Sequence, residues 1–230
     1  MARSFCFPGV GERSGRGAAS IRTWKLNYLY LLKYVMEKLT NYLSRFSYLN
    51  TTDIASLAEK CTAETFEPGQ LLVKAGDVCQ HVFFLEEGIV RSFYYTAAGD
   101  ENTYCINFPD SFVTAYSSLI TQLPTVENME ACTPVRVRML HKKHIEQLGN
   151  ENLGWMRFQK EIAEFHYLEL ERRIHQLQNM PAKDRYHHLL NERPEYLLNI
   201  PVQHLSSYLG ITPRHLSRIR KEVHYRTNVL

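Results

Sequence analysis

Residues 200–221 read IPVQHLSSYLGITPRHLSRIRK, and this stretch predicts two short helices joined by a tight turn. Apolar side chains recur on one face of each helix, and Gly210 supplies the left-handed backbone conformation that ends the first one. Thr212 has the chemistry of an N-cap, and Pro213 suits the first position of a new helix. Two such helices that share apolar residues across a glycine turn form a helix-turn-helix.

The polar side chains of the second helix are rich in hydrogen-bond donors, and residues 212–221 contain no acidic residue. Arg218 and Arg214 are predicted to contact base edges, because an arginine fork matches the O6/N7 edge of guanine. A capping residue, further hydrogen-bond donors and phosphate contacts complete the predicted DNA-binding set. The whole set is Thr212, Arg214, His215, Ser217, Arg218, Arg220, Lys221, Gln203 and His204. The alternative interpretation is an ordinary helical hairpin with a solvated basic face.

Composition places the whole chain among soluble globular proteins, with 230 residues, 44% of them hydrophobic and 22% charged. The net charge of +3 conceals a gradient. Residues 61–150 hold 11 acidic against 6 basic side chains, whereas residues 181–230 hold 8 basic against 4 acidic ones. A basic end beside an acidic middle indicates a part that faces nucleic acid.

Upstream of this end, the hydrophobic pattern has a period of two and then a period of 3.6. Between residues 66 and 140, short apolar runs alternate with turns at Gly69, Gly76, Gly88 and Gly99, which predicts an antiparallel β-barrel or sandwich with one helix near residues 111–121. After residue 150 a long helix ends at Pro181. Its aromatic-rich stripe is predicted to pair with a second copy: Trp155, Phe158, Ile162, Phe165 and Leu168.

The order of these parts, together with the signature Phe66-x-x-Gly69-x-x-Leu72-x-x-x-Gly76-Asp77, resembles the catabolite-activator and anaerobic-regulator (Crp/Fnr) family of bacterial transcription factors. The resemblance implies an α+β fold: an N-terminal antiparallel β-roll like that of cyclic-nucleotide-binding proteins, a long central dimerisation helix and a C-terminal winged helix-turn-helix. The predicted boundaries are 1–35 for a disordered or non-native extension, which lacks the order that begins at Met36, 36–149 for the sensory β-roll, 150–180 for the dimerisation helix and 181–230 for the DNA-binding domain.

The recognition helix and the sensory region both depart from the family's patterns. The family's Ser/Thr-Arg-Glu-Thr-Val-Gly-Arg lies on residues 212–218, where Pro213 and Arg214 replace the usual Arg and Glu, so the family's operator does not carry over. The chain after residue 222 also leaves room only for a short wing. Cyclic AMP binders of the family use a Gly-Glu pair and an Arg followed by Ser or Thr, and neither stands in residues 109–114 or 124–128. We therefore expect weak cyclic AMP binding or none, because a buried phosphate without its cation is costly.

The effector is unidentified, and its candidate pocket consists of Phe112, Thr114, Tyr116, Thr125 and Glu127. No metal ligand set, cofactor or catalytic residue is expected, since the five cysteines form no C-x-x-C pair and Cys6 and Cys61 supply no iron–sulfur cluster. The predicted partners are double-stranded DNA, a second copy of the chain, RNA polymerase and a small-molecule effector, in the cytoplasm and without a membrane. Two alternatives remain: a cupin-like barrel that acts as an enzyme or small-molecule binder, and an interaction protein that binds duplexes without sequence preference.

Overall fold

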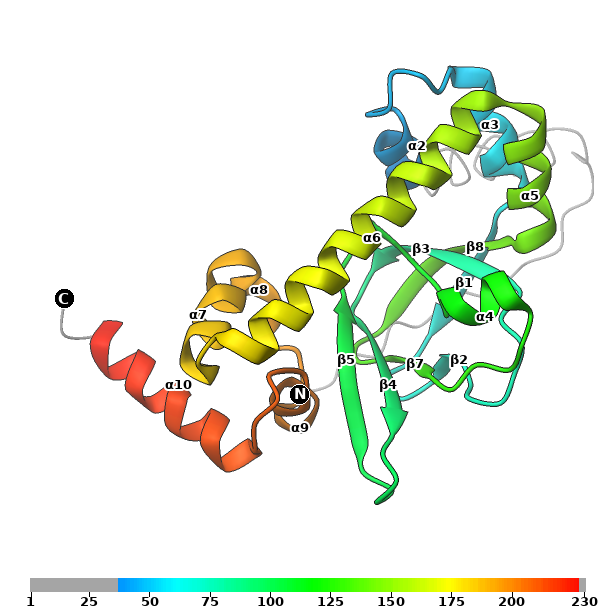
Figure 1. Ribbon diagram of the computed structural model, residues 1–230. Helices are drawn as coiled ribbons and strands as arrows, with labels where there is room; N and C mark the ends of the chain where they lie inside the picture. The colour runs from blue at the N-terminus through cyan, green and yellow to red at the C-terminus, as the bar shows by residue number, and fades with distance from the viewer. Residues whose placement is uncertain (1–36, 228–230) are drawn as a thin grey trace, which may run out of the picture. The chain divides into compact units, whose positions relative to one another are not determined.

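The computed structural model describes residues 37–227, in which two helices are followed by strands and then by further helices. The predicted α+β fold is confirmed (Figure 1). The first two helices, α2 and α3, span Glu37–Leu43 and Thr51–Lys60. The strands are β1 (Thr62–Phe66), β2 (Leu71–Val73), β3 (His81–Glu87), β4 (Val90–Tyr95), β5 (Glu101–Asn107), β6 (Ser111–Val113), β7 (Asn128–Ala131) and β8 (Val135–His141).

The strands form two four-stranded sheets of antiparallel pairs, in the orders β1-β8-β3-β6 and β2-β7-β4-β5. Side chains along β3 alternate between two hydrophobic clusters, as a period of two requires. Phe83 and Leu85 enter the core of the roll with Val90 of β4, whereas Phe84 points the other way, toward the flanking helices. The roll therefore has an inner face and an outer face that are both apolar.

The predicted turn glycines all adopt positive φ, and the tightest of them joins β3 to β4. Gly88 has a φ of 88°, and a Cβ atom built on it would lie 2.3 Å from the carbonyl oxygen of Pro134. Both the backbone conformation and the close approach require glycine at this position.

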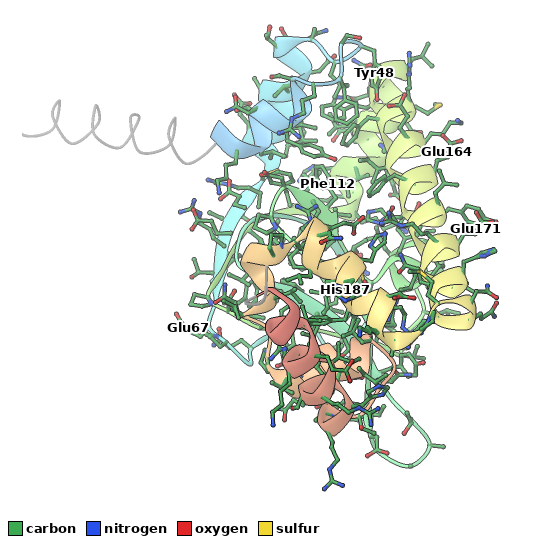
Figure 2. The ribbon with its side chains drawn as sticks, turned by 90° about the vertical axis from the view of Figure 1, so that its left-hand side faces the viewer. Tyr48, Glu67, Phe112, Glu164, Glu171 and His187 are labelled. Atoms are coloured by element: carbon green, nitrogen blue, oxygen red, sulfur yellow. The ribbon has the colours of Figure 1, made fainter. Side chains whose placement is uncertain are left out.

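Helices cover the outer face of the first sheet: α4 (Tyr116–Thr121), α5 (Lys142–Glu151) and α6 (Leu153–Asn179). The single helix predicted near residues 111–121 divides into β6 and α4, because Ser111–Val113 pair with β3. Phe112 lies between α2 and α6, with its ring centroid 5.6 Å from those of Tyr42 and Phe158 (Figure 2). Glu164 and Glu171 point away from the sheets along α6 in the same view.

The C-terminal part consists of α7 (Ala182–Glu192), α8 (Pro194–Leu197), α9 (Val202–Tyr208) and α10 (Pro213–Thr227). Room for a short wing was expected after residue 222, but α10 continues to Thr227, and the residues after it lie outside the described part of the chain. The predicted extension at residues 1–35 lies outside the described residues. None of the helices in the described part of the chain is long and apolar enough to cross a membrane.

Candidate nucleic-acid interface and sensory pocket

The turn between α9 and α10 is built as the sequence predicts. Gly210 has a φ of 65°, and the Thr212 hydroxyl accepts a hydrogen bond from the backbone N–H of His215 at 3.2 Å. Leu205 and Leu216 are fully buried beneath the turn. The two helices therefore share one apolar core that fixes the direction of α10.

The outer face of α10 carries a row of exposed polar side chains: Arg214, Ser217, Arg218 and Lys221. Arg214 and Lys221 each lie three and four residues from Ser217 and Arg218, so the four side chains share one side of the helix. Thr212 and Gln203 are also exposed, at the start of α10 and on α9. The structure thus brings together an exposed donor face that no carboxylate of residues 212–221 interrupts.

Three of the predicted contact residues are placed differently. His215 and Arg220 are half-buried, and the Arg220 guanidinium donates to the Leu197 carbonyl at 3.4 Å, which ties α10 to α8. His204 is half-buried near the second sheet, where burial and the neighbouring Arg91 lower the pKa of its imidazole. Arg220 and His204 therefore contribute to the packing of these helices and do not belong to the exposed row.

The helix α9 packs on strand β5. Ser207 Oγ accepts a hydrogen bond from the Thr103 backbone N–H at 2.9 Å and donates to the Glu101 carbonyl at 3.2 Å. Beneath α9, the buried Arg91 pairs with Glu101 and Glu130 at 2.6 Å each. Ile89 and Ile106 of the roll also belong to the same hydrophobic cluster as the helix-turn-helix core.

Two arginines that the sequence reading did not single out hold the carbonyl end of α9. Arg173 on α6 donates to the Tyr208 carbonyl, and its guanidinium carbon lies 3.9 Å from the centroid of the Tyr208 ring. Arg185 on α7 donates to the Leu209 carbonyl at 2.7 Å. Cations at a helix C-terminus satisfy its free carbonyl groups and its partial negative charge. No periodicity or spacing marks these residues, because their partners lie far away in sequence.

The face of α6 predicted for dimerisation is corrected in part. Trp155 and Phe158 are 2% and 6% exposed and pack against the outer face of the roll, and Ile162 is partly buried beside them. Phe165 and Leu168 are exposed. A different stripe is left uncovered on this subunit except at the half-buried Ala163, and its positions alternate by three and four residues from that alanine onward: Met156, Ala163, Tyr167, Leu170, Ile174 and Leu177.

A cavity of about 330 Å³ lies between α4, α5, α6 and the outer face of the roll. Phe112, Thr114 and Tyr116 of the predicted effector pocket line it, but Thr125 and Glu127 do not. Those two residues are buried, and the Tyr104 hydroxyl donates to the Glu127 carboxylate, whose pKa is raised by burial. The structure therefore divides the predicted pocket between two places.

The thiols within residues 37–227 are free, and burial raises the pKa of Cys61 and Cys132 to about 12 and that of Cys105 to about 11. Cys61, Cys105 and Cys132 are therefore protonated at neutral pH and are poor nucleophiles. The same part of the chain holds no group of three or more His, Cys, Asp or Glu side chains that could bind a metal ion.

Comparison with known proteins agrees with this geometry. Residues 63–152 match the family model of the cyclic nucleotide-binding domain. FixK2 from Bradyrhizobium japonicum is similar in structure, with a TM-score of 0.66, 17% identity and coverage of 73% of this chain and 86% of its own. A putative transcriptional regulator of the Crp/Fnr family from Eubacterium rectale gives a TM-score of 0.63, 14% identity and coverage of 81% and 88%.

The catabolite activator protein of Thermus thermophilus is also similar, with a TM-score of 0.50, 17% identity and coverage of 79% of this chain and 87% of its own. No curated protein sequence matches the chain. At these identities the structural likeness shows the fold.

Proposed function

We propose that this chain, which has a cyclic nucleotide-binding domain at residues 63–152 and the fold of the Crp/Fnr-type proteins, is a homodimeric, sequence-specific DNA-binding transcription regulator. One observation carries the proposal: the exposed row on α10 presents Arg214, Ser217, Arg218 and Lys221 on the helix that follows the turn at Gly210. A helix of this kind enters the major groove with its first residues nearest the bases.

Within that row the roles differ by position and chemistry. Arg214 and Arg218 have planar guanidinium groups that can donate two hydrogen bonds to O6 and N7 of guanine. Lys221 lies about one helical turn beyond Arg218, further from the start of α10, and we assign it to a phosphate contact. Gln203, exposed on α9, is assigned to the backbone of the same half-site.

The uncovered stripe of α6 supports the homodimer. Tyr167, Leu170, Ile174 and Leu177 are between 43% and 66% exposed in one subunit. An apolar stripe with alternating three- and four-residue spacing is the seam of a two-stranded helical pair. Pairing along this stripe would place two copies of α10 on half-sites about one helical turn, roughly 34 Å, apart.

Regulation by cyclic AMP is not part of the proposal, since the family's phosphate-binding arginine does not stand at residues 124–128. The regulator would act in the cytoplasm with RNA polymerase as a further partner and would respond to another effector. It would not be an enzyme.

The test is selection of bound duplexes from a random pool by the full chain, followed by competition between selected and random duplexes at fixed salt. A palindromic consensus supports the proposal, and the variant R218A should lose preference at one position of each half-site. The variant R172M, altered at an exposed arginine of α6 outside the α10 row, is the matched control and should select the same consensus. Failure of the pool to enrich would overturn sequence-specific recognition, and a single half-site without symmetry would overturn the dimer.

A further inference from the structure

The cavity beside α6 has a well-defined floor and a half-open mouth. Leu140, Trp155 and Phe158 at its wall are between 2% and 6% exposed, whereas Tyr116 and Ile120 of α4 are 48% and 58% exposed. Its volume of about 330 Å³ is in the range of small-molecule sites, roughly 300–1,000 Å³.

This cavity is separate from the interior of the roll. From the end of β6 to Ala115 the side chains alternate between two spaces. Val113 and Ala115 enter the inner core, while Phe112 and Thr114 face the cavity. The alternation of a strand therefore puts the wall between the two spaces at β6 itself. A ligand in the cavity would contact α4, α5 and α6 and not Thr125 or Glu127.

The charges at the wall favour a neutral ligand. Among the described residues that line the cavity, Lys142 alone is a lysine or arginine. Its ammonium lies 3.4 Å from the Glu146 carboxylate. Burial lowers the pKa of the His166 imidazole, which favours its neutral form. A phosphate or sulfonate would therefore enter an apolar space without a free counterion, which is costly.

The α6 side chains at the cavity are largely different from those of the proposed dimer seam. The α6 side chains at the cavity include Trp155, Phe158 and Ile162, on one face of the helix. The exposed stripe lies on the neighbouring side of α6, about 75° around the helix, and the two sides adjoin at Ala163, which belongs to both sets. An empty apolar hollow forfeits packing contacts and takes up apolar molecules readily.

We propose that the cavity between α4, α5 and α6 is an effector site for a small, neutral, largely apolar molecule, and that α6 transmits its occupancy to the helix-turn-helix. The transmission rests on the proposed function. Helix α6, which is 27 residues long, provides a continuous path for this transmission. It lines the cavity at Trp155 and further along carries Arg173, which contacts Tyr208 of α9. A ligand that braces α4 against α6 thereby acts on the helix that holds α9.

Binding is tested without DNA, using the neutral fluorophore N-phenyl-1-naphthylamine and, as its charged counterpart, 1-anilinonaphthalene-8-sulfonate. The full chain should bind one neutral probe per subunit, and the sulfonate at least about tenfold more weakly. L119W fills the cavity from α4, and I120W narrows its mouth at an exposed position that folding tolerates. L123W, at a 64% exposed leucine outside the lining, is the matched control.

Both cavity variants should weaken the neutral probe, L119W by at least about tenfold, while L123W should leave its affinity unchanged. Equal affinity in wild type, L119W and I120W, or equal affinity for the sulfonate, would overturn the site. The coupling is tested separately: the neutral probe should change the affinity of the wild type for its selected duplex by about fivefold or more, and that of L119W much less. No change in the wild type would overturn the effector role, whereas failure of the duplex selection itself would count against the proposed function only.

Discussion

The backbone N–H of Thr103, on β5, donates to the hydroxyl of Ser207, on α9, across 2.9 Å. The same hydroxyl donates to the Glu101 carbonyl, so one side chain on α9 satisfies both a donor and an acceptor of the roll's second sheet. Thr103 is 1% exposed, and water cannot easily replace Ser207 as its partner. The roll and the helix pair α9–α10 are therefore joined by a specific polar contact as well as by the shared hydrophobic cluster.

The first prediction concerns this contact. Replacing Ser207 with Ala should destabilise the packing of α9 on β5 by about 1–3 kcal/mol, because it leaves the Thr103 N–H buried without a partner. Amide hydrogen exchange at Thr103 should accelerate accordingly. S217A changes an exposed serine on α10 and should leave that exchange rate as it is. Unchanged protection in S207A would contradict the docked arrangement.

A second prediction separates two adjacent arginines of α6. R173M should lower the free energy of unfolding by about 1–3 kcal/mol, since it removes both the hydrogen bond to the Tyr208 carbonyl and the guanidinium over the Tyr208 ring. R172M removes exposed ion pairs to Glu169 and Glu192 and should cost about 0–1 kcal/mol. Urea denaturation of both variants measures the difference, and equal costs would refute the special role of Arg173.

The third prediction distinguishes the two apolar faces of α6. The double variant L170D/I174D should raise the dimer dissociation constant by about 100-fold or more, because it puts charges in the centre of the proposed seam. Sedimentation equilibrium reports the change. L198D, at an 89% exposed leucine outside α6, is the control and should remain as dimeric as the wild type.

Phe158 belongs to the other face and should behave differently. F158A should lower the free energy of unfolding by about 3–5 kcal/mol, since it empties a buried site against the roll. Dimer loss in F158A without loss of stability would reverse the assignment of the two faces.

The fourth prediction follows from His204. Burial, and then Arg91, lower the pKa of its imidazole, while Glu130 and Glu101 act in the opposite direction. The unfolded chain, with a histidine pKa of about 6.5, binds the proton more readily. The contribution of neutral His204 to stability is therefore complete above that pH and is lost as the pH falls toward the lowered pKa. H204Q should show a smaller loss of unfolding free energy between pH 7.5 and 5.5 than the wild type, and an equal or larger loss would contradict this account.

The fifth prediction concerns the α10 row. R218A should cost about 1–3 kcal/mol of affinity for the selected duplex and relax the preference at one base pair. K221A should weaken selected and random duplexes alike and reduce the slope of log affinity against log salt by about 1. Titrations at several salt concentrations separate the two effects, and a uniform loss in R218A would place Arg218 on phosphate.

Local features of the sequence were sufficient for much of the fold. The cap and turn at Gly210 and Thr212, and the turn glycines of the roll, depend on neighbours within a few residues, and the structure has them as predicted. The inner face of α6 was harder to identify, because both Trp155 and Tyr167 stand on apolar stripes of helical period. Which stripe meets the roll depends on Phe84 and Phe112, which are distant in sequence.

The same limit applies to the pocket and to the packing of α9. Phe112 lines the cavity and Glu127 is buried elsewhere beside Tyr104, and a sequence pattern gives the alternation of a strand but not the space beyond each face. Arg173 and Arg185 find their carbonyl partners 35 and 24 residues away. Such partners are set by the final packing of α6, α7 and α9.

Contacts at both ends fix the length of α6. Trp155 packs the beginning of α6 against the roll, and Arg173 near its other end binds α9. Because α9 itself packs on β5, both ends of α6 are connected to the roll. One inserted residue between these anchors would advance the helix by about 1.5 Å and rotate everything after it by about 100°. Insertions and deletions within α6 should therefore be far less tolerated than substitutions, and the number of residues between Trp155 and Arg173 becomes a constraint as strict as their identities.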